Sequence, residues 1–178
     1  IKGDSLSCLA YVGNGKDWID VFEDNGIKCI VSAGGGNRLN NSELDNQTDS
    51  WYKTKVVGIQ SGTNSWGNGV SIAQCQATLQ SIVNFWFSRG YKVAIEQSLP
   101  RNDVNPTYTN VAYNAMLSLI TNATIITYPT SLNDPNDSTK LNDFYSDETT
   151  GQEVHLNVAG NLVWANHKLP QYQALLNQ

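Results

Sequence analysis

The sequence predicts an α/β fold of three layers, in which helices cover both faces of a central parallel sheet of about five strands. Short apolar runs of strand length alternate along the chain with segments in which apolar residues recur at helical spacing. The runs are rich in Val and Ile, as are strands that are buried on both faces. This alternation is typical of a parallel sheet, and the length fits a single domain over residues 1–178.

Five segments are expected to form the strands. The first is the short stretch Ile1–Lys2, immediately before a polar loop. The other four are compact runs with many β-branched residues: Ile27–Ser32, Lys55–Gln60, Lys92–Gln97 and Ala123–Thr127. Because parallel strands are joined by right-handed crossovers, only a few topologies remain for such a sheet.

Four segments are expected to form helices: Lys16–Asn25, Ser71–Arg89, Thr109–Asn122 and Asn157–Asn166. Gly26 and Gly90 follow the first two and are expected to end them, because glycine readily adopts the left-handed conformation of a helix C-terminus. Pro170 is expected to limit the extension of the last helix. The apolar face of the third is expected to carry Ala112, Met116, Leu119 and Ile120.

The loops after the strands are the expected place for a functional site, because ligands bind at the carboxyl ends of strands in such sheets. Four loops qualify, and two of them are long and polar. They are Gly3–Ser7, Ala33–Asp49, Ser61–Gly69 and Tyr128–Glu153.

The composition favours a neutral partner. The formal net charge is -5 and only 15% of residues are charged, whereas nucleic-acid binding needs clustered Lys and Arg. Binding to anionic membranes is disfavoured for the same reason, and no apolar run approaches the roughly 20 residues of a membrane helix. A small-molecule or carbohydrate substrate fits these features, and they do not indicate an oligomeric state.

Metal and disulfide chemistry have little support in the sequence. Cys8, Cys29 and Cys75 form no CxxC pair and the chain has two histidines, so no structural zinc site is expected. One disulfide with a spare thiol stays open. The sequence begins with Ile1 and reaches its first motif at once, so we expect a piece of a longer chain, of extracellular or phage tail-associated origin.

Three segments after predicted strands carry residues suited to nucleophilic chemistry. Ser5, in GDSL at residues 3–6, lies at a strand-to-helix turn, where developing negative charge is favoured; the alternative is a helix N-cap. Asn64, in GTN at residues 62–64, could donate its amide to an oxyanion or be a turn residue. Glycines at 34–36 leave backbone N–H groups open to a ligand but lack the spacing of a dinucleotide motif.

The two histidines are the candidates for a general base. His155, in VHLN at residues 154–157, lies between a polar loop and a helix, where it could face the Ser5 loop. His167 is expected near a helix end, as a solvated residue or one that faces the helix dipole.

Together these four segments resemble, in order and over nearly the whole chain, the four blocks of the GDSL/SGNH hydrolase family. The resemblance implies a flavodoxin-like SGNH hydrolase fold and the hydrolysis of esters without a cofactor. It implies that Ser5 is the nucleophile and donates its own N–H to the oxyanion. Gly36, or one of the two preceding glycines, would donate a second N–H, Asn64 would donate its side-chain amide, and His155 would be the general base.

Two positions depart from the family pattern. The family has an Asp three residues before the His, and this position is Gln152, with Glu153 beside it. Glu153 could supply the missing charge, Gln152 could orient the base through its carbonyl oxygen, and a backbone carbonyl or Asp147 are further options. The third block continues with Ser65 rather than Asp, which is expected to alter the support of the loop.

The preferred function is the hydrolysis of O-acetyl groups on a carbohydrate. Trp66, like Trp51 and Tyr52, lies in or beside a predicted site loop and could stack on a sugar ring, or pack the loop onto the core instead. Abundant Asn, Gln, Ser and Thr suit hydrogen bonding to hydroxyls. The alternatives are a carbohydrate-binding domain that has lost catalysis, and a lipase or thioesterase.

Overall fold

The computed structural model describes residues 2–3, 18–29, 32–33, 39, 55–102, 110–147 and 155–178. In these parts of the chain five parallel strands form one sheet in the order β2-β1-β3-β4-β5. The strands are β1 (Lys2–Gly3), β2 (Ser32–Ala33), β3 (Val56–Gln60), β4 (Lys92–Glu96) and β5 (Thr124–Ile126). The predicted parallel sheet of about five strands is therefore confirmed.

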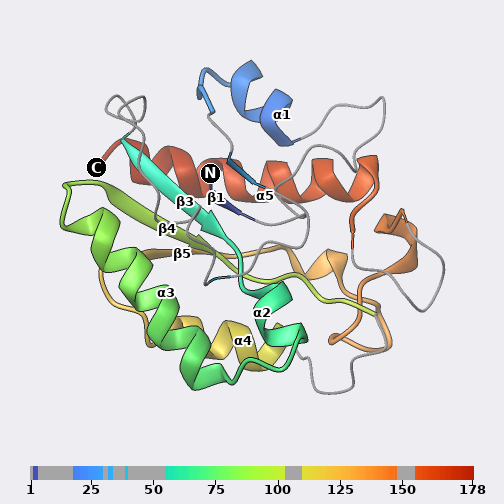
Figure 1. The fold of residues 1–178 in the computed structure, drawn as a ribbon. Helices are drawn as coiled ribbons and strands as arrows, with labels where there is room; N and C mark the ends of the chain where they lie inside the picture. Colours follow the sequence, from blue (N-terminus) through green and yellow to red (C-terminus); the bar gives the residue numbers. More distant parts are fainter. Residues whose placement is uncertain are drawn as a thin grey trace.

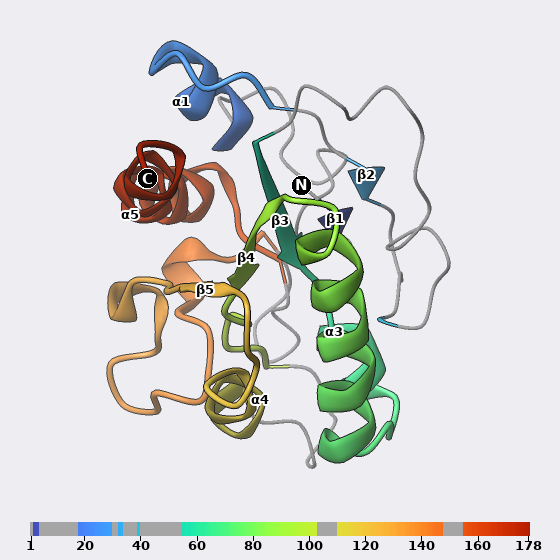
Figure 2. The same cartoon turned by 90° about the vertical axis from the view of Figure 1, so that its left-hand side faces the viewer.

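Helices cover both faces of this sheet (Figure 1). They are α1 (Trp18–Asp24), α2 (Thr63–Gly67), α3 (Ile72–Phe87), α4 (Asn110–Leu117) and α5 (Val158–Leu176), with short 3-10 helices η4 (Thr130–Leu132) and η5 (Asp143–Tyr145). Figure 2 shows α3 and α4 on one side of the sheet and α1 and α5 on the other. This arrangement confirms the predicted three-layer α/β/α sandwich.

Helix α3 illustrates how local sequence sets an element. The Ser71 hydroxyl accepts a hydrogen bond from the Gln74 N–H at 3.3 Å, and the Gln74 side chain accepts one from the Ser71 N–H at 3.2 Å. This capping box satisfies donors that have no partner inside the helix. At the other end Gly90 has a φ of +85°, and Gly26 after α1 has a φ of +78°. Both glycines end their helices as predicted.

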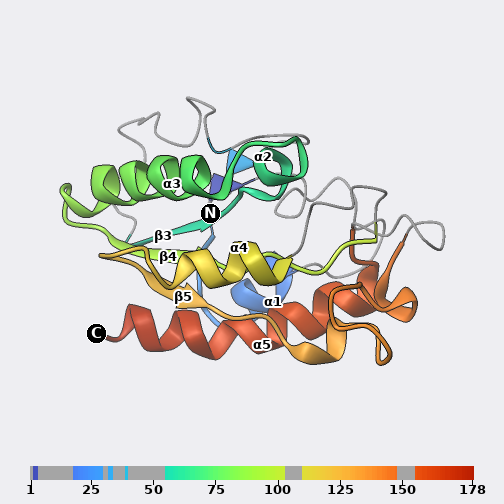
Figure 3. The ribbon, with the colours of Figure 1, turned by 90° about the horizontal axis from the view of Figure 1, so that it is seen from below.

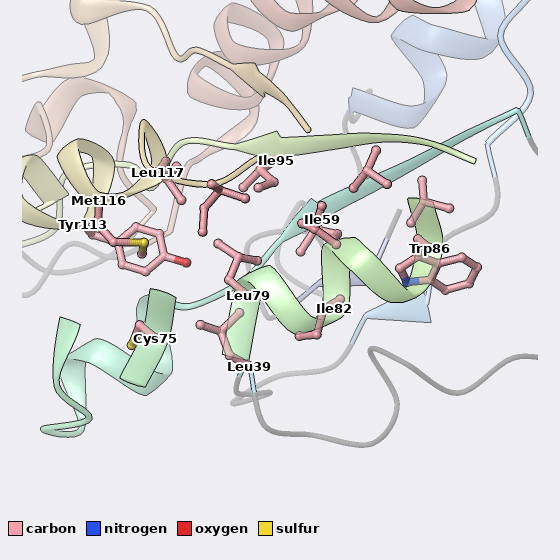
Figure 4. Close-up of a cluster of buried hydrophobic side chains, with 14 residues drawn as sticks. Leu39, Ile59, Cys75, Leu79, Ile82, Trp86, Ile95, Tyr113, Met116 and Leu117 are labelled. Carbon is pink, nitrogen blue, oxygen red and sulfur yellow. The ribbon is translucent and has the colours of Figure 1, made fainter. Parts of the chain in front are cut away.

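Alternate residues of the central strands supply the two halves of the core. Val57 and Ile59 of β3 join a cluster with α3 and α4, while Val56 packs against the cluster formed with α1 and α5. The first cluster, which we call the α3–α4 core, contains Leu39, Leu79, Trp86 and Tyr113 among its buried side chains (Figure 4). The period of two along each strand thus divides its side chains between the two helical layers.

A buried ion pair lies in the layer of α1 and α5. Lys168 of α5 is 3.2 Å from the carboxylate of Glu96 on β4, and each side chain is 1% exposed. The Tyr172 hydroxyl donates to the other Glu96 oxygen at 2.8 Å. The Lys168 ammonium also lies about 4 Å from the ring centres of Trp18 and Trp164, at 4.0 and 3.9 Å. These contacts offset the free-energy cost of removing the two charges from water. They also join α5 to the sheet and to α1.

The expected end of the last helix at Asn166 is wrong. Helix α5 continues to Leu176 with Pro170 inside it, along the sheet face opposite α3 (Figure 3). Proline removes one backbone donor and crowds the carbonyl four residues earlier. Buried Lys168, Tyr172 and Leu175 lie on both sides of this position, so packing against the sheet and α1 offsets the local cost.

The expected helix Thr109–Asn122 is shorter than predicted. Helix α4 ends at Leu117, after which Leu119 and Ile120 donate to carbonyls three residues earlier and Asn122 takes a φ of +62°. This tighter turn breaks the helical period. Leu119 is consequently 61% exposed and not part of the apolar face, whereas Tyr113 and Leu117 are buried in it.

The strand expected at Ile27–Ser32 and two expected loops also differ from the structure. Residues 27–29 are not in a strand, and β2 comes later, at Ser32–Ala33. Ile27 and Cys29 instead pack against the α1–α5 side of the core, so their apolar character reflects burial rather than sheet pairing. The loop expected at Ser61–Gly69 contains α2, and the one expected at Tyr128–Glu153 contains η4 and η5.

Candidate active site

The carboxyl ends of three neighbouring strands meet at one edge of the sheet. Gly3 at the end of β1 pairs with Ala33 at the end of β2 and with Gln60 at the end of β3. Gly3 is the first residue of the GDSL segment, the glycine-rich segment follows Ala33 directly, and the GTN segment begins two residues after Gln60. The predicted site residues Ser5 and Gly36 lie outside the described residues, whereas Asn64 and His155 lie within them.

The turn between β3 and α2 is fixed from both sides. Gly62 has a φ of +118°, a conformation that side-chain-bearing residues rarely adopt, and a Cβ here would overlap the hydroxyl of Tyr113. That hydroxyl donates to the Ser61 carbonyl at 2.7 Å, in a buried position. Tyr113 of α4 therefore supports the turn that leads to Asn64.

Asn64 lies in the first turn of α2 and is half-buried. Its carbonyl accepts from the Asn68 side chain at 2.6 Å, while the Trp66 N–H donates to the Gly62 carbonyl at 2.9 Å. These bonds hold the short helix at both ends. The backbone that carries the Asn64 amide is thus fixed just beyond the carboxyl end of β3.

His155 is half-buried and lies two residues before Asn157, the N-cap of α5. Its carbonyl accepts from the Asp147 N–H at 3.4 Å, and Leu156 forms an antiparallel bridge with Ser146. Asn157 caps α5 by accepting from the Gly160 N–H at 2.9 Å. His155 is therefore held between a helix cap and a short strand-like pairing.

The segment after His155 belongs to the carboxyl side of the sheet. Leu156 is buried in a small cluster with Leu99, which comes three residues after β4, and with Leu132, Leu141 and Trp164. The side chain of Asn157 donates to the carbonyls of Phe144 and Ser146, at 2.9 and 3.0 Å. These contacts join η5, the start of α5 and the end of β4.

Solved structures match this architecture along almost the whole chain. A protein from Bacteroides fragilis assigned as an acylhydrolase superposes with a TM-score of 0.76 at 18% identity, covering 98% of this chain and 86% of that one. A GDSL-like lipase from Bacteroides thetaiotaomicron gives 0.70 at 16% identity, covering 99% and 86%. An acetylxylan esterase from Geobacillus stearothermophilus, in a catalytic mutant, gives 0.69 at 16% identity, covering 96% and 91%.

The chain has the GDSL/SGNH hydrolase fold. The resemblance stated from four short motifs is thereby confirmed at the level of the fold. No protein-family model matches the sequence, and no curated protein matches it either.

Within the SGNH fold, the group that would orient His155 is only partly visible. Gln152 and Glu153 both lie outside the described residues. Asp147 is described and exposed, and its backbone is paired with that of His155. Their proximity arises from the bridge between Ser146 and Leu156, which no sequence pattern signals.

Trp66 lies on α2 and is half-buried, with its ring packed against the α3–α4 core. Its indole Nε1 is buried and has no hydrogen-bond partner. The packing role considered from the sequence is thus present, and a contact with substrate stays a prediction. Trp51 and Tyr52 lie outside the described residues.

His167 lies in the interior of α5 and not near its end, because that helix is longer than predicted. Its Nε2 is 3.0 Å from the Thr127 hydroxyl, just beyond the edge strand β5. Since β3 and β4 separate β5 from β1, this histidine lies beside the opposite part of the sheet from the start of the GDSL segment.

Within the described residues no group of three or more His, Cys, Asp or Glu side chains could hold a metal ion. Cys29 and Cys75 are free thiols, and burial raises the pKa of both. Cys8 lies outside the described residues. No helix in the described part of the chain is long and apolar enough to cross a membrane.

Proposed function

We propose that this protein is a serine esterase in which Ser5 is the nucleophile and His155 is the general base. The observation that carries the proposal is the junction of β2, β1 and β3, whose last residues are paired side by side. The segments holding Gly36, Ser5 and Asn64 leave from these three strand ends. Three separate parts of the sequence therefore begin at the same edge of the sheet.

The proposed reaction proceeds in two steps. The Ser5 Oγ attacks the ester carbonyl carbon while His155 accepts the hydroxyl proton, and the oxyanion that forms is stabilised by N–H donors. The donors are the backbone N–H groups of Ser5 and Gly36 and the side-chain amide of Asn64. Collapse expels the alcohol, which takes the proton from His155. Water, deprotonated by His155, then releases the acid and restores Ser5.

Hydrolysis of O-acetyl groups on a carbohydrate is the substrate class that we favour. An acetylxylan esterase is among the proteins that share the fold. Phe144 is 71% exposed and stacks edge-to-face on Tyr145, with ring centres 5.0 Å apart. Both belong to η5, which is hydrogen-bonded to the cap of α5 next to His155. Exposed aromatic rings can contact the apolar face of a sugar ring.

Hydrolysis of p-nitrophenyl acetate by wild type, Ser5→Ala, His155→Ala and the double variant tests the chemistry. Each single variant is expected to lose nearly all activity, and the double variant to be little worse, because residues that act as one unit are non-additive. Ser5→Ala is expected to remain folded, since a serine cap contributes only about 1 kcal/mol. Losses that multiply independently would contradict the proposed pair.

Substrate class is tested separately, with acetylated xylo-oligosaccharides and p-nitrophenyl esters of longer acids. Preference for acetyl groups on the oligosaccharide supports the carbohydrate assignment, and preference for long acyl chains contradicts it in favour of a lipase. Binding of the oligosaccharide without any hydrolysis would favour the non-catalytic binding domain.

A further inference from the structure

A buried hydrogen bond joins two of the proposed oxyanion segments. The Leu39 N–H donates to the Ser65 hydroxyl at 2.9 Å, across 26 residues of sequence, and both residues are 2% exposed. Ser65 directly follows Asn64, and Leu39 comes three residues after Gly36. The bond therefore connects the neighbour of one proposed donor with the segment that carries another.

The acceptor end of this bond is rigidly supported. Ser65 lies within α2, and its carbonyl also accepts from the Val70 N–H at 3.1 Å. The turn before α2 is held by the buried hydrogen bond from Tyr113 to Ser61. The Ser65 hydroxyl is thus attached to backbone that is fixed on both sides. It can therefore determine the position of the Leu39 backbone.

Leu39, the donor of this bond, is held by its buried side chain and by its N–H group. The side chain of Leu39 is buried in the α3–α4 core, where Leu79 and Ile82 of α3 are members of the same cluster (Figure 4). Its N–H would be a buried donor without a partner if the Ser65 hydroxyl were absent, which is unfavourable in a protein interior. Packing holds Leu39 in the core, and the hydrogen bond fixes its backbone relative to α2.

We propose that Ser65 is a positioning residue that sets the separation between the Asn64 amide and the N–H donor of the glycine-rich segment. The proposal rests on the proposed esterase function. Oxyanion donors act within a narrow range of about 2.7–3.1 Å from the developing charge, and a displacement of about 1 Å can cost roughly 100-fold in rate. Ser65 acts through these two donors and does not itself contact the substrate.

Kinetics of Ser65→Ala test this role. The kcat for p-nitrophenyl acetate is expected to fall roughly 10- to 100-fold with little change in KM, because the donors matter chiefly when negative charge develops. Ser65→Thr, which keeps a hydroxyl, is expected to retain most of the wild-type kcat. A merely structural role would lower the amount of folded enzyme and leave the kcat of the folded fraction intact.

Ser61→Ala is the matched control. Ser61 is buried directly after β3, four residues before Ser65, but its hydroxyl has no hydrogen-bond partner. The same substitution there removes an equal group without breaking a bond, so kcat is expected to stay at the wild-type level. Equal losses in Ser61→Ala and Ser65→Ala would overturn the proposal.

Amide hydrogen exchange of Leu39 supplies a readout that does not depend on activity, and its wild-type part needs no variant. In the wild type this amide is expected to be protected, and in Ser65→Ala to exchange faster. An unprotected Leu39 amide in the wild type, or an unchanged kcat in Ser65→Ala, would overturn the positioning role. A wild-type protein without esterase activity but with a protected Leu39 amide would instead overturn the proposed function.

Discussion

At the scale of single residues, Asn64 is the proposed oxyanion donor whose support is visible in the structure. Its backbone is held by Asn68 and by the turn at Gly62, which accommodates Tyr113 only because glycine has no Cβ. A donor fixed before the substrate arrives needs no reorganisation when charge develops. The effect of its removal should therefore appear in the rate of the chemical step rather than in binding.

We expect Asn64→Ala to lower kcat by roughly 100- to 1000-fold with little change in KM, as the loss of one oxyanion donor does. Steady-state kinetics with p-nitrophenyl acetate measure this. Asn166→Ala is a suitable control, because Asn166 is exposed on α5 and its side chain donates only to the Leu162 carbonyl of the same helix. An unchanged kcat in Asn64→Ala would show that the residue serves only the turn.

The group that orients His155 can be identified by substitutions at three positions. If Glu153 supplies the charge, Glu153→Gln should cost up to about 10⁴ in kcat, because a neutral amide favours the wrong tautomer of the base. If Gln152 is the orienter, Gln152→Ala should lower kcat and Gln152→Asp should keep or raise it. A drop only in Asp147→Asn would assign the role to Asp147. An unchanged kcat in the variants at all three positions would leave the base oriented by backbone.

At the scale of elements, the contact between α5 and η5 carries the support of His155. Gly160 lies in the first turn of α5, and a Cβ here would be 2.6 Å from the Tyr145 carbonyl oxygen and 3.0 Å from its Cβ. Because one of these atoms is backbone, the neighbour cannot move aside cheaply. The close approach lets the Asn157 N–H donate to that same carbonyl at 2.8 Å.

Gly160→Ala should therefore push the start of α5 away from η5. The overlap is expected to cost about 1–3 kcal/mol, as overpacking of a tight site does, and to lower kcat through displacement of His155. Urea denaturation and esterase kinetics measure the two effects. Ala159→Gly, one residue earlier on an exposed face of α5, is the matched control and should leave kcat unchanged. A fully stable and active Gly160→Ala would show that the two elements can separate freely.

The elements that could be predicted from sequence are those whose local signals and burial agree. The segments that became β3, β4, α3 and α1 have clear periods and, for the helices, a glycine stop. The prediction failed where tertiary packing decided the outcome, as at Pro170, where buried residues on both sides extend α5. Ile27 and Cys29 were predicted as strand residues because an apolar run looks the same in a strand and in an irregular segment that packs on the core.

In the candidate site, the positions of the motifs could be predicted from the sequence, but their supporting contacts could not. Three of the four motifs begin at or just after strand ends, and the register pairs Gly3, the first residue of GDSL, with Ala33 and Gln60, which lie just before the other two. The contacts that support the site residues were not predictable. Tyr113, Ser65 and Asp147 act across 52, 26 and 8 residues of sequence respectively, on Ser61, Leu39 and His155. Such pairings depend on the packed structure and leave no local pattern.

At the scale of the whole molecule, the buried hydroxyl of Tyr172, which contacts Glu96, makes stability depend on pH. Burial, and then the negative charge and hydrogen bond of Glu96, raise the pKa of Tyr172 well above its usual value. The folded state therefore holds this proton more tightly than the unfolded state, in which the pKa is about 10. The contribution is complete below pH ~10 and is lost as the pH rises above it.

We expect the free energy of unfolding to fall above pH ~10, by up to about 1.36 kcal/mol per pH unit for Tyr172. Tyr172→Phe has no proton to lose, so it should be less stable at neutral pH but show a shallower decline between pH 10 and 11. The decline should not vanish, because burial also raises the pKa values of Tyr128, Cys29 and Cys75. Urea denaturation at several pH values measures the slopes, and equal slopes in both proteins would contradict the assignment.

The all-parallel sheet has a consequence for the order of events during folding. Every strand pairing in it joins distant parts of the chain, such as Lys2 with Ile59, Val56 with Lys92, and Ala94 with Thr124. No hairpin is available among these pairings to start the sheet, so a long loop must close before any ladder bond forms. Helix α3, with its own capping box and glycine stop, satisfies its hydrogen bonds locally. Helical structure should therefore appear early in refolding, and the sheet should be completed late.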